Sequence, residues 1–166
     1  MNALRTAHLM AALLAASALS ACDNGDCTPR GTPLVELGRG TGGVFEPFAE
    51  GQEVNLDVAP QGGFGVSIQA RTEGIPTGAV KLKMDSVIDG ELAGTWTIES
   101  IDLLCQAEDG TGLMWGAVVG LDQEKFKDND ALLALNGKRL TMVVTLTDEL
   151  GDETIGETTV TVKVGG

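Results

Sequence analysis

The chain has 166 residues, of which 24 are acidic and 11 are basic, so its formal net charge is −13. This length fits one ordinary globular domain, and an apolar fraction of 43% supplies enough side chains for a packed core. The charge excludes a nucleic-acid partner, because binding to phosphates needs a basic face.

The first 22 residues have the pattern of an export signal. A start with one positive charge, Arg5, precedes an apolar run over residues 9–19, which is too short to span a bilayer. The run ends in Leu-Ser-Ala-Cys at residues 19–22, a sequence that resembles the lipobox of bacterial lipoproteins. This resemblance implies cleavage between Ala21 and Cys22 and attachment of a diacylglyceryl group to Cys22.

The resemblance divides the chain into a lipoprotein signal peptide (1–21), a lipidated N-terminus with a linker (22–33) and an exported domain (34–166). Acyl chains would hold the domain at the cell membrane or outer membrane, in the periplasm or outside the cell. Two other interpretations stay open. One is an ordinary secretory signal cut after Ala21, which leaves Cys22 as a thiol. The other is an N-terminal helix that is buried or spans the membrane.

Removal of residues 1–21 would leave 145 residues with 24 acids and 10 bases, because Arg5 is lost. The single histidine, His8, is lost with it. A nucleophile activated by histidine then cannot be built, and zinc and copper lose their commonest ligand. We therefore expect no catalytic residues, no metal site and no enzymatic activity.

The cysteines predict one disulfide. Lipidation of Cys22 leaves Cys27 and Cys105, an even number in an oxidising compartment. A bridge between them would close a loop of 78 residues and, from chain entropy, would stabilise the fold by roughly 4 kcal/mol. Two free thiols are the alternative. A redox dithiol is disfavoured because the sequence has no Cys-x-x-Cys.

Beyond residue 33 the dominant hydrophobic period is two, which predicts β-strands with one buried face. Alternation is clearest over residues 53–58, 66–71, 80–85, 113–121, 142–146 and 160–164. Asp89-Gly90 predicts a tight hairpin turn. The last two of these segments predict a C-terminal hairpin, with the acidic residues 148–152 near its turn.

The segment after Asp89-Gly90 has a defect in its alternation. Leu92, Trp96 and Ile98 share even parity, whereas Ile101, Leu103 and Cys105 share odd parity. One regular strand cannot bury both sets. A β-bulge near Glu99-Ser100, or a strand that changes sheets, would reconcile them.

About eight strands, and at most one short helix within residues 122–135, predict an all-β fold: an antiparallel β-sandwich or barrel. Residues 141–162 resemble the last two strands of bacterial immunoglobulin-like domains, which implies an immunoglobulin-like sandwich. Trp96 and Trp115 are expected in its core.

Carboxylates are the only abundant reactive groups, and they cluster at 108–109, 122–130 and 148–153. Calcium takes six to eight oxygen ligands, but no cluster has the spacing of a calcium loop, so solvated acidic loops are favoured. A glycosidase pair of carboxylates has no positive support, because sequence cannot supply their separation in space. Residues 38–43 are glycine-rich yet lack the lysine and following helix of a phosphate loop.

These observations predict a lipid-anchored binding or structural module of the cell envelope. Its expected partners are the membrane, through the lipid anchor, and an envelope protein or glycan, with no cofactor and no nucleic acid. Two alternatives are a calcium-dependent adhesion or assembly domain and, with least support, a carboxylate-based hydrolase.

Overall fold

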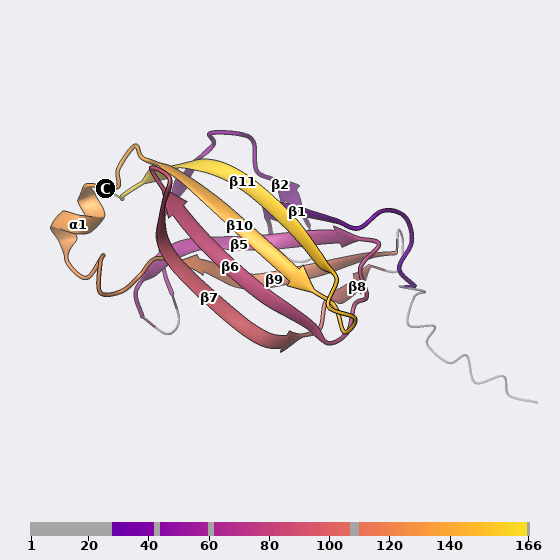
Figure 1. The fold of residues 1–166 in the computed structure, drawn as a ribbon. Helices are drawn as coiled ribbons and strands as arrows, with labels where there is room; N and C mark the ends of the chain where they lie inside the picture. Colours follow the sequence, from indigo (N-terminus) through magenta and orange to yellow (C-terminus); the bar gives the residue numbers. More distant parts are fainter. Residues whose placement is uncertain (1–27, 42–43, 60–61, 107–109, 166) are drawn as a thin grey trace, which may run out of the picture.

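A computed structural model describes residues 28–41, 44–59, 62–106 and 110–165. It confirms the predicted all-β class: two sheets pack face to face as a sandwich (Figure 1). The signal peptide, Ala21, Cys22 and Cys27 lie outside the described residues.

The first sheet has the order β2-β1-β5-β9-β8, and β4 also pairs with β5. Its strands are β1 (Leu34–Arg39), β2 (Glu46–Pro47), β4 (Asp57–Val58), β5 (Phe64–Glu73), β8 (Leu104–Gln106) and β9 (Thr111–Gly120). All the pairs in this sheet are antiparallel.

The second sheet has the order β3-β11-β10-β6-β7. Its strands are β3 (Glu53–Asn55), β6 (Val80–Ile88), β7 (Glu91–Ile101), β10 (Arg139–Thr147) and β11 (Glu153–Lys163). The pair of β3 with β11 is parallel and the others are antiparallel. The described residues form eleven strands rather than about eight, because four of these strands have only two or three residues.

The core lies between the sheets and follows the predicted alternation. Leu82 and Met84 of β6 are buried, whereas Lys81 and Lys83 between them are exposed. On the neighbouring strand β10, Leu140 is completely buried opposite Val160 and Ile88 of the strands on either side. Apolar burial of this kind is the main force that holds two sheets together.

Both predicted hairpins are confirmed. Asp89 and Gly90 join β6 to β7 with φ angles of 52° and 83°, the left-handed conformation that a two-residue hairpin turn needs at both positions. In the β10–β11 hairpin, the Asp148 carboxylate accepts hydrogen bonds from the backbone N–H groups of Leu150 (2.9 Å) and Asp152 (3.0 Å).

The parity defect in β7 is resolved in both of the ways that the sequence offered. Leu82 pairs with Ile98 but Val80 pairs with Ile101, so Glu99 and Ser100 together oppose Lys81 as a bulge. After Ile101 the chain leaves the second sheet and crosses to the first, where it forms β8. The predicted short helix is α1 (Asn129–Leu133), which Asp128 caps.

Two sequence predictions about single segments are wrong. The expected strand over residues 53–58 is two short strands, β3 and β4, which belong to different sheets. Both tryptophans were expected in the core, yet Trp96 is 47% and Trp115 is 57% exposed.

The two tryptophans are exposed for different reasons. In β9, Met114 pairs with Ala70 and Ala117 with Ile68, so Trp115 and Gly116 form a bulge opposite Gln69. Gly116 takes a φ of 77° there, and the extra residue breaks the alternation that would have placed Trp115 in the core. Trp96 pairs with the buried Met84 and so faces the core side of its sheet, but β7 is the last strand and its inner face is incompletely covered.

Candidate binding cleft

The side of the sandwich where β7 meets β9 contains an open apolar cleft. In the described part of the chain, no strand pairs with the outer edge of β7. Beside it, β9 pairs with β8 only over residues 111–113. A cavity of about 460 Å³ lies between the two strands. Its lining combines residues 95, 96 and 98 of β7, residues 116–118 and 120 of β9, and Ala59, Gly62, Phe64, Met84, Leu121, Asp122 and Gln123.

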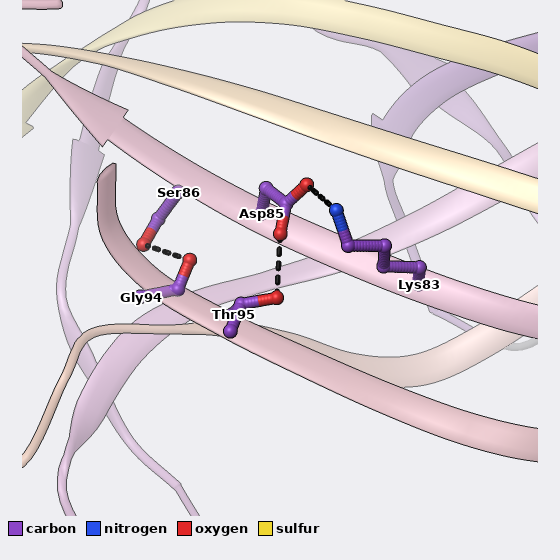
Figure 2. A network of polar contacts seen from close by, with 5 residues as sticks. All are labelled: Lys83, Asp85, Ser86, Gly94 and Thr95. Atoms are coloured by element: carbon purple, nitrogen blue, oxygen red, sulfur yellow. Dashed lines mark hydrogen bonds and ion pairs between the residues drawn. The ribbon is translucent and has the colours of Figure 1, made fainter. Parts of the chain in front are cut away.

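One end of the cleft closes through backbone contact between the sheets. A side chain on Gly94 would overlap the carbonyl oxygen of Gly120, so glycine is what allows β7 to approach β9 this closely. The Asp122 N–H donates to the Ala93 carbonyl at 2.7 Å. The buried Ser86 hydroxyl lies 2.9 Å from the Gly120 carbonyl oxygen. It lies 3.3 Å from the Gly94 carbonyl oxygen, the contact drawn in Figure 2.

Beyond the cleft-lining residues of β7, the chain crosses between the sheets after Ile101. The Leu103 side chain is buried, and its N–H donates to the Thr77 carbonyl at 2.6 Å. Asp102 accepts a hydrogen bond from the Ala79 N–H at 3.1 Å. β7 is therefore linked to the first sheet on both sides of its cleft-lining residues, by the hydrogen bond at Ala93 and by the chain itself after Ile101.

The walls of the cleft are apolar and its mouth is polar. Trp96 and Ile98 extend from β7 toward Phe64 and Leu121 on the opposite side, and Ile98 is 36% exposed. At the mouth, the Gln123 side-chain amide donates to the Gly62 carbonyl at 3.0 Å. Half-exposed aromatic and branched side chains around a cavity are typical of sites that bind an apolar ligand.

A polar network lies on the outer face beside the cleft. The Asp85 carboxylate accepts hydrogen bonds from the Thr95 hydroxyl and the Lys83 ammonium, both at 2.6 Å (Figure 2). Partial burial alone would raise the pKa of Asp85, but the hydrogen bonds from Lys83 and Thr95 and the lysine charge outweigh it, so the pKa is lowered. Such a carboxylate contributes stability above its unfolded pKa, and that contribution is lost as the pH falls through its folded pKa.

Replacement of Thr95 by valine is expected to raise the pKa of Asp85 toward its ordinary value, because it removes one of the hydrogen bonds that favour the charged carboxylate. The carboxyl carbon of Asp85, followed by NMR during an acid titration, measures this. Thr97→Val is the control, since Thr97 lies two residues further along β7 and pairs with Lys83 rather than Asp85. An equal change in both variants would contradict the assignment.

A second, smaller cavity of about 290 Å³ lies on the outer face of the first sheet, beside Trp115. Gln69 lies in its wall and is 4% exposed. The Gln69 amide donates to the Gly40 carbonyl at 3.0 Å, but its buried oxygen has no hydrogen-bond partner. That oxygen lies beneath Gly40 and is closed to solvent, so it is not open to a ligand in this cavity, whose lining also includes Arg39, Thr41, Ser67 and Trp115.

Residues 108–109 lie outside the described residues, and in the other two acidic segments Asp122, Asp128 and Asp148 accept hydrogen bonds from the local backbone. Asp122 accepts from the N–H groups of Glu124 (2.8 Å) and Lys125 (3.2 Å), and Asp128 accepts from Ala131 N–H at 2.9 Å. Within the described residues no three histidine, cysteine or acidic side chains come together as a metal site. Nothing in this arrangement favours the calcium alternative.

Of the predicted site residues, Ala21, Cys22 and Cys27 lie outside the described residues, and Cys105 lies within them. Cys105 in β8 is disulfide-bonded and is the only cysteine among the described residues. Its pairing with Cys27 stays a prediction.

The sequence analysis did not find the cleft. Trp96, the half-exposed tryptophan in its wall, was assigned to the core because of its parity. Parity does not distinguish an edge strand from a central one. A signal was nevertheless present in β9, whose ten residues include no charge.

Comparisons with known proteins do not narrow the function. No protein-family model matches the chain, and no curated protein is similar enough to match it. Among the described residues, none of the helices has the length and apolar character needed to cross a membrane.

Proposed function

We propose that this protein is a lipid-anchored binding module of the cell envelope, which binds an apolar segment of a partner in the β7–β9 cleft and does not catalyse a reaction. The cleft with Trp96 half exposed in its wall is the observation that supports the proposal. A tryptophan of this exposure next to a cavity gains apolar contact when a ligand covers it.

The lipid anchor in this proposal is inferred from the lipobox-like residues 19–22. A bridge between Cys27 and Cys105 would leave residues 23–26 as the tether between anchor and domain. At roughly 3.3–3.6 Å per residue, so short a tether would keep the domain near the bilayer surface, where its partner would be another component of the envelope.

Mass spectrometry of the N-terminal peptide tests both parts of this tether. We expect a peptide that begins at Cys22, carries the mass of the acyl chains and stays joined to the Cys105 peptide until it is reduced. Cys22→Ala should lose the acyl mass, and Cys27→Ser should release the Cys105 peptide without reduction. An unmodified Cys22 in the wild-type protein would contradict the anchor, and a Cys105 peptide released without reduction from the wild-type protein would contradict the bridge.

Photo-crosslinking in intact cell envelopes tests the binding site. A crosslinking amino acid replaces Ile98 in the cleft or, as a matched control, Ile155, which is 58% exposed on β11 outside it. We expect a discrete crosslinked product from position 98 that is absent from position 155. Products of equal yield from both positions, or from neither, would contradict a binding site in the cleft.

A further inference from the structure

We infer that the cleft binds its partner by strand addition: an extended polypeptide lies between β7 and β9 and forms hydrogen bonds with their free edges. This inference rests on the proposed function and specifies the chemical class of the ligand. It distinguishes a polypeptide from a lipid chain or a glycan, neither of which has a backbone that matches a strand edge.

The first argument is the backbone on the two sides of the cleft. The outer edge of β7 has no partner strand in the described structure, and β9 is paired on that side only at residues 111–113. An unpaired strand edge presents a row of N–H and C=O groups. A ligand that crosses this cleft meets such a row on both sides, and an extended peptide is the ligand that satisfies them.

The second argument is that these edges lack charge and proline, two of the three usual protections, although both strands contain bulges. Proteins blunt exposed edges with charges, proline or bulges. The stretch of β7 between its two bulges, residues 94–98, carries no charge, and neither does β9 over Thr111–Gly120. Charged residues make up 21% of the whole chain, yet both facing edges lack them over these stretches. Uncharged edges of this kind are what a strand-binding site requires.

The third argument is the match between the walls and the side chains of a strand. Trp96 and Ile98 lie two residues apart on β7 and face the same side. An added strand places alternate side chains on this side as well. Its inward residues would contact Trp96, Ile98 and Leu121, so alternating apolar residues should be preferred.

The negative charge near the cleft favours a peptide from a different protein over a second copy of this chain as the occupant. β7 carries Glu91 and Glu99 at either end of its uncharged stretch and no basic residue, and Asp122 is the one charged residue of the lining. The chain as a whole carries −13. Two copies that met at this edge would repel each other, whereas a peptide with basic residues on either side of an apolar centre would be attracted.

A synthetic peptide with alternating valine and threonine between pairs of lysines serves as the probe. The chain contains two tryptophans, so Trp115→Phe makes Trp96 the only fluorescent one. We expect the emission of Trp96 to shift to shorter wavelength on titration with the peptide. The same peptide methylated at alternate backbone nitrogens keeps its side chains and charge but loses donors, and it should bind about tenfold or more weakly.

Four further measurements test the place of binding and its dependence on charge. Ile98→Thr should weaken binding of the unmethylated peptide, whereas Ile155→Thr should not. Glutamate in place of the flanking lysines should weaken binding, and added salt should weaken binding of the lysine peptide.

The outcomes separate the two proposals. Equal binding of the methylated and unmethylated peptides would overturn strand addition while leaving an apolar site. Failure of the peptide to bind, with crosslinking from position 98 intact, would do the same. A crosslink from position 98 between two copies of this chain would overturn the basic partner. Loss of both peptide binding and crosslinking would overturn the proposed function itself.

Discussion

Leu140→Ala is expected to lower the free energy of unfolding by about 2–5 kcal/mol, the range measured for buried leucines. Leu140 is completely buried, and it lies on β10, a strand with neighbours on both sides. Val160 and Ile88 lie opposite it on those neighbours. Two flanking strands hold the backbone in place, so the surroundings cannot collapse into the space that the side chain leaves.

Chemical denaturation of the domain measures this loss. Leu150→Ala is the matched control, because Leu150 lies in the β10–β11 turn and is 87% exposed. Its replacement should change stability by less than about 0.5 kcal/mol, as is usual for surface positions. Similar losses for the two variants would show that β10 is not the centre of the core.

Gly94→Ala is expected to destabilise the domain by about 1–3 kcal/mol, the usual cost of forcing extra atoms into a packed site. The new β carbon would overlap the Gly120 carbonyl oxygen and approach the Asp122 backbone nitrogen. The backbone would have to separate β7 from β9 and stretch the hydrogen bond from Asp122 N–H to the Ala93 carbonyl. The closed end of the cleft would then open.

The control for this variant is Gly120, whose carbonyl oxygen faces Gly94 where β7 approaches β9. A β carbon on Gly120 would meet none of the described atoms within 4 Å, and the φ angle of Gly120 is not among the positive ones. Gly120→Ala should therefore leave stability close to that of the wild type. Denaturation curves that coincide for Gly94→Ala and Gly120→Ala would contradict the close approach of β7 to β9 at Gly94.

The sequence predicted the fold class and its central elements because those depend on local patterns. A period of two identifies a strand wherever both of its neighbours are present, as in β6 and β10. The Asp89-Gly90 dipeptide identified its turn because few residues accept the backbone conformation that the turn requires. The bulge at Glu99-Ser100 was also predictable from a local pattern, since a bulge changes the parity of the apolar residues within a single strand.

The candidate site was not predictable because it depends on which strands lie at an edge. Trp96 has the parity of a core residue and does face inward, yet it is half exposed since no strand among the described residues pairs with the outer edge of β7. Trp115 follows a regular alternation in the sequence, and the bulge that turns it outward has Gln69 of another strand as its partner. Strand order and cross-strand register are tertiary properties, which the local hydrophobic pattern of a segment does not specify.

The parallel pair of β3 and β11 has a consequence for the order in which the domain can fold. Glu53–Asn55 pair with residues 161–163, and nearby the Gly51 N–H donates to the Thr159 carbonyl at 2.8 Å. More than a hundred residues separate these partners, and contacts of such sequence separation slow folding. While the chain is made from its N-terminus, residues 49–55 have no place to dock until the final strand emerges. Removal of residues 161–166 should therefore release β3, because residues 161–163 are the part of β11 with which β3 pairs.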